Sequence, residues 1–292
     1  MSTGRKIVKN PIISCSRRTD IPAFLMDWVL ERIKIGYVDV ENPFNKNQVS
    51  RVSLKPNDVR CWVWWSKDFS SWIKSYNAYP EVFKQYKGHY FQFTINSPSE
   101  LESNLKTTLH DRLKQLKWLT QEFGPQAISY RFDPIILYKR DDSEKIYSNL
   151  NKFEHIIHKV AHNGIKEMIF SFATLYSKVI NRMKRRDKIA LPISFEKKVK
   201  ILDKLKSICD KYEIQMKACC QPDLLTIEGI EQAHCIDAYK IENLTGGFIP
   251  KKKDTGQREA CGCFKSKDIG GYTGIFRCKH NCDYCYASPS RK

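Results

Sequence analysis

Short runs of β-branched and aromatic residues alternate with amphipathic stretches along this 292-residue chain, and this alternation constrains its fold most. Strands separated by helices at such a spacing form βαβ units with a parallel sheet. The expected strands are 11–16, 59–65, 90–95, 128–132, 168–173, 214–218 and 271–276. The expected helices are 24–35, 99–123, 143–162 and 195–212. We therefore predict an α/β fold built as a TIM-like βα barrel, complete or partial; a doubly wound open sheet is the alternative.

The length of the chain suits one large domain or two ordinary ones. We predict a single βα-barrel domain over residues 1–292, in which residues 257–292 form a cysteine-rich C-terminal segment. A hairpin inserted over residues 37–54 is also expected.

Polar residues and one cysteine follow the predicted strands, at the carboxyl edge where βα folds build their sites. They are Arg17, Arg18, Asp20, Lys67, Asp68, Asn96, Arg131, Asp133 and Cys219. Arginine forks suit carboxylates or phosphates, and carboxylates suit ribose hydroxyls or an amine. The candidates for binding a cofactor or substrate are therefore Arg17, Arg18, Asp20, Arg131 and Asp133. For Arg131 and Asp133, a structural network at the strand end is the alternative.

Three cysteines near the C-terminus have the spacing C-x3-C-x2-C: Cys278, Cys282 and Cys285. A short loop of this kind lets three thiolates bind one [4Fe–4S] cluster and leaves one iron open for another ligand. Structural zinc, which uses four ligands, and reduced thiols without metal are the alternatives. His280 within the loop is expected to face solvent, and Tyr284 is expected to pack beside the cluster.

A second group of cysteines could bind another cluster or zinc. Cys261 and Cys263 would need two more thiols, and Cys219 and Cys235 are the best candidates. Cys220 stays an alternative because it adjoins Cys219. The remaining cysteines lie within strand or helix patterns and are interpreted as buried small apolar residues: Cys15, Cys61 and Cys209.

The chain carries 50 Lys and Arg against 32 Asp and Glu, a net charge of +18, which favours DNA or RNA as a partner. A merely basic surface is the alternative. The densest basic runs are 178–188 and 251–253, which could contact phosphates or form a solvated face. Aromatic faces for base stacking, or else core residues, are Trp62, Trp64, Trp65 and Trp72.

The chain contains no apolar run of the ~20 residues that span a bilayer and no signal-peptide pattern. We therefore expect a cytoplasmic protein with no membrane partner. Clustered cysteines in that compartment indicate metal binding or catalysis more often than disulfides.

The cysteine spacing, with an aromatic residue before the third cysteine, resembles the radical S-adenosylmethionine superfamily. Longer stretches are similar to the DUF1848 family, which is defined by sequence without an assigned activity. These stretches are 14–23, 41–44, 131–136, 257–258, 261–263, 266, 268–270 and 285–287. The superfamily resemblance implies that the open iron binds S-adenosylmethionine and cleaves it reductively to a 5′-deoxyadenosyl radical. It also implies an electron donor such as ferredoxin or flavodoxin, and it places Tyr284 beside the cofactor.

The position of the cysteine loop departs from that superfamily, where the loop follows the first barrel strand. Here the strand predicted at 271–276 would be the first strand moved to the end of the chain, as in a circular permutation; otherwise the tail is a cluster-bearing lid. The leading hypothesis is a radical enzyme that modifies or repairs nucleic acid. The alternatives are a nucleic-acid-binding protein with a structural metal site and a redox protein with a saturated cluster.

Overall fold

The computed structural model describes residues 6–43 and 45–287. Its centre is an eight-stranded sheet in which every neighbouring pair of strands is parallel. In spatial order the strands are β13 (Ile230–Gln232), β12 (Gln215–Ala218), β10 (Glu167–Phe172), β7 (Ile128–Ile135), β6 (Gly88–Thr94), β5 (Cys61–Ser66), β2 (Ile12–Cys15) and β14 (Lys267–Asp268). The βαβ pattern read from the sequence is therefore confirmed.

The strand order runs through the sheet without a reversal. From β2 to β13 the neighbours follow the order of the chain, and β14, the last strand in sequence, adds beside β2. A doubly wound sheet would instead reverse its order near the centre. Within the described residues, β13 and β14 are the two edges of the sheet, so the sheet is open and a complete barrel is not formed.

The two faces of the sheet bury different partners because successive side chains on a strand point to opposite faces. In β5, Trp62 and Trp64 pack in the larger apolar core with the helices, whereas Cys61 and Val63 pack in a smaller core on the other face. That smaller core includes Ile241 of helix α9 (Ala238–Thr245) and several cysteines.

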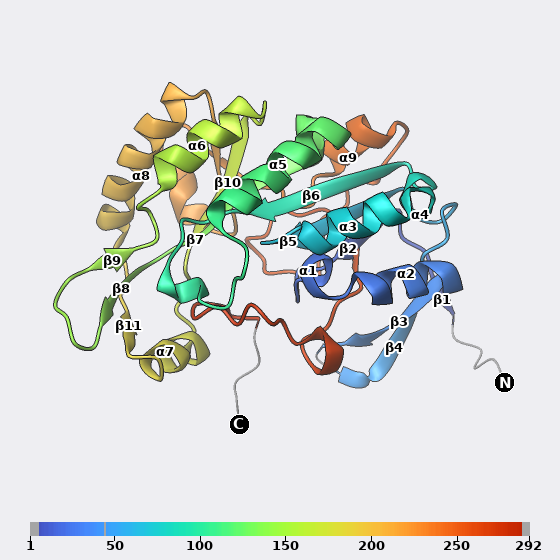
Figure 1. The fold of residues 1–292 in the computed structure, drawn as a ribbon, viewed down its shortest axis with the longest axis horizontal. Coiled ribbons are helices and arrows are strands. Elements are labelled where there is room, and N and C mark those ends of the chain that lie inside the picture. Colours follow the sequence, from blue (N-terminus) through green and yellow to red (C-terminus); the bar gives the residue numbers. More distant parts are fainter. Residues whose placement is uncertain (1–5, 44, 288–292) are drawn as a thin grey trace.

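Helices cover the face of the larger core (Figure 1). They are α1 (Ile21–Phe24), α2 (Met26–Ile35), α3 (Ser70–Ala78), α4 (Pro80–Lys84), α5 (Leu109–Phe123), α6 (Phe153–His162) and α8 (Phe195–Lys211). Short 3₁₀ turns are η1 (Glu100–Glu102), η2 (Pro125–Ala127), η3 (Pro222–Thr226) and η4 (Gly274–Phe276). No helix in the described part of the chain is long and apolar enough to cross a membrane.

Two small sheets flank the central one. The predicted hairpin is confirmed: β3 (Tyr37–Asn42) pairs antiparallel with β4 (Asn45–Ser53), and β1 (Ile7–Val8) adds parallel to β4. The second sheet consists of β11 (Lys188–Ala190), β8 (Leu137–Arg140) and β9 (Tyr147–Ser148), all antiparallel. Helix α7 (Ser177–Lys184) leads into β11.

Two predicted helices begin too early. The helix expected from residue 99 starts at Leu109, where Thr108 and Asp111 form a capping box: each side chain bonds the other residue's backbone N–H, at 3.1 and 3.0 Å. The helix expected from residue 143 starts at Phe153, because Tyr147 and Ser148 pair with β8 instead. Tertiary pairing and capping therefore outweighed helical periodicity in both segments.

The strand expected at 271–276 is wrong. Residues 274–276 form η4, and the strand that joins the sheet is β14, four residues earlier than expected. Asp268 fixes this register, because its carboxylate accepts hydrogen bonds from Ser14 and Ser16, both at 2.8 Å. Gly270 allows the chain to pass close to β2: a Cβ there would lie 2.0 Å from Ser16 Oγ.

The tryptophans are mostly core residues. Trp62, Trp64 and Trp72 are fully buried against one another and neighbouring rings, so the base-stacking interpretation is wrong for these three. Trp65 is half-buried on the other face, where the Arg131 guanidinium lies 5.3 Å from its ring centre.

Candidate metal centre

The C-terminal segment passes along the carboxyl edge of the sheet, from the side of β3 and β4 to α7 (Figure 1). It contacts residues that follow β2, β5 and β6. The parallel strands bring these residues to one edge, as the sequence predicts. The three cysteines of the C-x3-C-x2-C loop, here called the tail cysteines, therefore lie where the polar strand ends meet.

The tail cysteines occupy a tight loop. Cys282 is buried, whereas Cys278 and Cys285 are half-buried, and the Cys285 N–H bonds the Cys282 carbonyl at 3.2 Å. Asn281 has a φ of +49°, a left-handed conformation that asparagine tolerates better than most residues. Burial raises the pKa of Cys278 to about 11 and that of Cys282 well above its usual value. Both thiols are therefore protonated at neutral pH unless a metal displaces the proton.

Glu102 joins this loop to the sheet edge. Its Oε1 accepts from Lys67 at 2.8 Å, from Asn96 at 3.0 Å and from the Tyr284 hydroxyl. Burial acts to raise the pKa of Glu102, but the charge of Lys67 and the hydrogen bonds from Lys67 and Tyr284 outweigh it and lower the pKa to about 2. Its Oε2 is buried and has no hydrogen-bond partner among the described residues.

Tyr284 was predicted to pack beside a cluster and to bind a cofactor. Tyr284 lies between Cys282 and Cys285 in the sequence, and its ring is buried. Its hydroxyl donates to Glu102 and lies 3.1 Å from Asn96 Nδ2. No sequence pattern singles out Glu102 as the partner, because it lies on a 3₁₀ turn between elements. The structure alone brings Lys67, Glu102 and Tyr284 together.

His280 is buried rather than exposed to solvent, so that prediction is wrong. Its Nε2 lies 2.9 Å from Asp20 Oδ2, and its ring packs on Phe24 with the ring centres 4.6 Å apart. Asp20 also accepts from the Ser66 hydroxyl at 2.7 Å and the Lys67 N–H at 2.9 Å. The Nδ1 of His280 is buried without a partner in the described chain. Asp20, a predicted cofactor ligand, therefore anchors the cysteine loop.

Arg17 and Arg18 bind the segment that leads to the tail. Arg17 Nη2 donates to Asp254 Oδ2 at 2.8 Å, and Arg18 Nη1 donates to the Gly270 carbonyl at 3.0 Å. The backbone N–H of Arg17 donates to Asp268 Oδ2 at 2.8 Å. Both predicted ligand-binding arginines therefore lie at the junction of β2 and β14, with their guanidinium groups in contact with protein.

Helix α7 and the residues that follow it, as far as Lys188 of β11, hold the other side of the tail. Arg186 donates to the Asn281 carbonyl at 3.0 Å and pairs with the Asp283 carboxylate, which Lys188 also approaches at 3.3 Å. Arg182 donates to the Cys285 carbonyl. The sequence predicts that the basic run 178–188 contacts phosphates or forms a solvated face, and no local pattern indicates this contact between residues about 100 positions apart.

Arg131 and Asp133 form an ion pair in which the Nη2–Oδ2 distance is 2.5 Å. Arg131 Nη1 also donates to Gln92 at 3.3 Å and to the Cys235 sulfur at 2.8 Å. Burial opposes the charged form of Arg131, but Cys235 and Asp133 outweigh it and raise the pKa of the guanidinium. The structural network considered for this pair is therefore present and extends to a cysteine.

Five further cysteines contact one another on the sheet face opposite the main helices; they are here called the thiol group. They are Cys219, Cys220, Cys235, Cys261 and Cys263. The sulfur atoms of Cys219 and Cys235 lie 3.5 Å apart. Four of these cysteines were predicted from the sequence to share a site, and the fifth, Cys220, was the alternative. Cys15, Cys61 and Cys209 are buried, as expected.

The described residues contain no group of three or more His, Cys, Asp and Glu side chains arranged so that it could hold a metal ion. Binding a metal at either set of cysteines would therefore require their side chains to reorient. The chemistry of the donors suits iron–sulfur clusters, because both sets consist of thiols.

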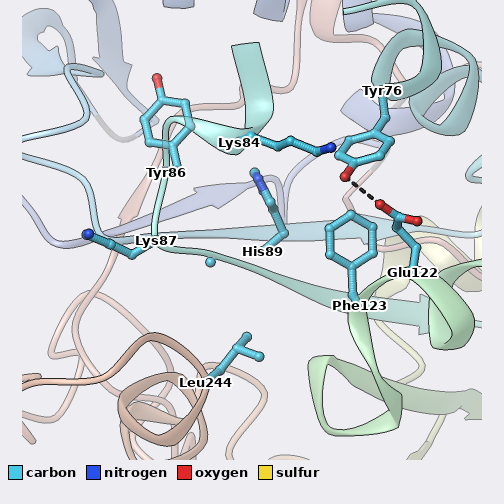
Figure 2. A pocket seen from close by; sticks show the side chains of 9 residues that line it. Tyr76, Lys84, Tyr86, Lys87, His89, Glu122, Phe123 and Leu244 are labelled. Atoms are coloured by element: carbon cyan, nitrogen blue, oxygen red, sulfur yellow. Dashed lines mark hydrogen bonds between the residues drawn. The ribbon is translucent and has the colours of Figure 1, made fainter. Parts of the chain in front are cut away.

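A pocket of about 300 Å³ lies at the opposite edge of the sheet, at the amino end of β6 (Figure 2). His89 lies in its wall, accepting from Trp64 Nε1 and bonding the Phe83 carbonyl, both at 3.0 Å. Burial lowers the pKa of His89 to about 4, so it is a neutral core histidine. Tyr76 donates to Glu122 at 2.7 Å across the pocket. None of the predicted site residues lines this pocket.

Comparison with curated proteins gives no match. One family model matches, the domain of unknown function DUF1848, over residues 12–287. The match covers both edge strands of the central sheet, the thiol group and the tail cysteines. The chain therefore belongs to the DUF1848 family.

Proposed function

We propose that this protein is a radical S-adenosylmethionine-type enzyme whose [4Fe–4S] cluster is held by Cys278, Cys282 and Cys285. The observation that carries the proposal is the position of the tail cysteines: they follow the edge strand β14 and lie at the carboxyl edge of the parallel sheet. That edge is where βα folds build their sites.

The order of the strands supports a permuted partial barrel. Because β14 pairs parallel with β2, the sheet read from this edge is β14, β2, β5, β6, β7, β10, β12 and β13. In spatial order the cysteine loop therefore follows the first strand, although it is last in the sequence. This is the arrangement expected if the superfamily's first strand had moved to the end of the chain.

The residues around the loop fit a ligand that brings its own polar groups. Three thiols alone would leave one iron of a cubane without a protein ligand. The Glu102 Oε2 and His280 Nδ1 atoms are buried beside the loop without partners in the described chain. An unpaired buried polar atom costs about 1–3 kcal/mol, so a ligand that reached these atoms would recover free energy.

The protein's own part in such a reaction is to position the loop and exclude water. Glu102 and Lys67 fix Tyr284, and Asp20 fixes His280, so the segment between Cys278 and Cys285 is held at two points. A bound cluster would supply the electron for the reductive cleavage of S-adenosylmethionine.

A nucleic-acid substrate is supported by charge near the tail cysteines. Helix α7, which bonds the tail through Arg182, exposes Lys178 and Lys184 to solvent, and Arg185 at the end of the helix is also exposed. With a net charge of +18, this surface suits a polyanion. Binding of single-stranded DNA or RNA should weaken steeply as salt is raised, and K178E/K184E/R185E should reduce both the affinity and the salt slope. Absence of binding at low salt would exclude this substrate class.

The enzyme proposal is tested by anaerobic reconstitution with iron and sulfide. We expect a brown protein that converts S-adenosylmethionine to 5′-deoxyadenosine under dithionite. C278A, C282A and C285A should each abolish turnover, whereas C209A, which replaces a buried cysteine outside both sets, should not. A cluster without any turnover would favour a redox protein, and a colourless protein with stoichiometric zinc would favour a structural site; either result would overturn the proposal.

A further inference from the structure

The thiol group is assembled from three separate segments of the chain. Cys219 and Cys220 follow β12, Cys235 follows β13, and Cys261 and Cys263 precede β14. β13 and β14 are the two edges of the open sheet, and residues 233–266 connect them. Three of the five cysteines lie on this connection, and the other two follow the neighbouring strand β12.

The contacts among the five sulfur atoms form a closed ring. Cys219 contacts both Cys220 and Cys235, and Cys263 contacts both Cys235 and Cys261. The contact between Cys261 and Cys220 completes the ring. Each thiol of the group therefore neighbours two others.

The surroundings exclude water and supply hydrogen bonds to sulfur. Cys235, Cys261 and Cys263 are 2, 7 and 3 % exposed, within the smaller apolar core. Arg131 Nη1 lies 2.8 Å from the Cys235 sulfur, and the Ile236 N–H lies 3.4 Å from the Cys263 sulfur. Hydrogen bonds to sulfur and a buried cation are the features that stabilise thiolate ligands.

Gly262 permits the Cys-Gly-Cys turn to approach the segment after β13. A Cβ at this position would lie 2.7 Å from the Ala233 carbonyl oxygen and 3.0 Å from the His234 ring. Any other residue would separate Cys261 and Cys263 from Cys235. The absence of a side chain at Gly262 therefore allows the thiols to come together.

We propose that the thiol group is a second, all-cysteine site that binds an iron–sulfur cluster through Cys219, Cys235, Cys261 and Cys263. An all-thiol donor set suits an iron–sulfur cluster, and Arg131 provides a positive charge beside the anionic thiolates of such a cluster. Cys219 and Cys220 are both half-buried, and Cys220 is assigned as the spare thiol because it is the Cys219 sulfur that lies 3.5 Å from the Cys235 sulfur, which Arg131 bonds. The site does not depend on the tail cysteines or on S-adenosylmethionine.

The experiment uses the full chain with C278A/C282A/C285A, which removes the tail site. After anaerobic reconstitution we expect about four iron and four sulfide ions per chain, the content of one cubane. Adding C235A, or C263S as a milder change, should remove this iron. Adding C220A or C209A should leave it unchanged. Circular dichroism and a cooperative unfolding transition establish that each variant is folded.

A spectroscopic readout tests the ligation. Because four thiolates leave no open iron, the electron paramagnetic resonance signal of the reduced tail-deficient variant should not change when S-adenosylmethionine is added. A changed signal would overturn all-cysteine ligation, and loss of iron in C220A would overturn the ligand assignment. A folded variant that takes up no iron, or that holds zinc without sulfide, would overturn the site.

Discussion

The tail cysteines and the thiol group lie on the same sheet but are held in place by different forces. Charged and polar contacts fix the tail: Asp20 with His280, Glu102 with Tyr284, and Arg186 with Asp283. The thiol group lies in an apolar core, and Arg131 is the charged residue that hydrogen-bonds one of its sulfur atoms. The first arrangement leaves two thiols half-exposed, whereas the second encloses three of its five.

This difference indicates how each site would respond to pH and to substitution. A loop held by ion pairs is sensitive to pH and to loss of one partner, because a buried charge without its partner is costly. A group held by apolar burial is sensitive mainly to loss of volume and hydrogen bonds. The half-exposed tail suits exchange of a ligand, and the enclosed group suits a cluster with no open position.

The largest effect is expected from Glu102→Ala, which breaks the polar attachment of the tail. It leaves the Lys67 charge without its partner, and we expect the free energy of unfolding to fall by about 3–5 kcal/mol. Urea titration measures this change. The matched control is Glu100→Ala two residues away, whose carboxylate pairs with an exposed Arg140 and accepts from the Tyr138 hydroxyl at 2.9 Å, and which should cost about 1 kcal/mol. Equal effects of the two substitutions would mean that Glu102 does not anchor the tail.

Acid should weaken the same attachment. The folded-state pKa of Glu102 is about 2 against an ordinary value of 4.5, so its contribution to stability is fully present above pH 4.5 and is lost as the pH falls toward 2. The difference corresponds to about 3 kcal/mol. Denaturant titrations across this pH range should show a shallower loss in Glu102→Gln. The same pH dependence in both proteins would contradict the proposed role of Glu102.

A smaller effect is expected from Arg131→Met on the side of the thiol group. The substitution removes the Arg131 donor from Gln92 and from the Cys235 sulfur, which keeps its contact with Cys219, and Asp133 is 26 % exposed and can be hydrated. We therefore expect destabilisation of about 2 kcal/mol. Arg140→Met, at an exposed position, serves as the control and should leave the stability almost unchanged. Chemical denaturation distinguishes the two.

The smallest effect is expected within the thiol group itself. Cys220→Ala should change the free energy of unfolding of the metal-free protein by less than about 1 kcal/mol, because Cys220 is half-buried. Cys263→Ala, at a 3 % exposed position, should cost about 1–2 kcal/mol through lost packing. Thermal unfolding of the two variants gives the order, and a reversed order would contradict the deeper packing of Cys263.

The parallel sheet could be predicted because each strand carries its own signal. Runs such as Ile12–Cys15 and Cys61–Ser66 are apolar on both faces, as strands covered on both sides must be. The two-residue strand β14 has no such signal, since its place depends on Asp268 bonding Ser14 and Ser16 about 250 residues away. Because these contacts are so distant in the chain, the sequence alone misplaces this strand.

The candidate sites divide in the same way. The spacing of the tail cysteines and the Cys-Gly-Cys pair mark chemistry locally, and they were found without a structure. The residues that bond the tail were not found in this way, because Glu102, Arg182 and Arg186 resemble ordinary surface charges in the sequence. His280 was predicted to face solvent because its burial depends on Asp20 and Phe24, which lie at the other end of the chain.

The sequence by itself determined the alternation of strands and helices, the two sets of cysteines and the excess of positive charge, because each is a property of neighbouring residues. Only the tertiary structure decided that the sheet stays open, that β14 adds beside β2, and that the five cysteines of the thiol group meet. Those outcomes depend on contacts between distant segments, and the free energy of such contacts cannot be read from a local sequence pattern.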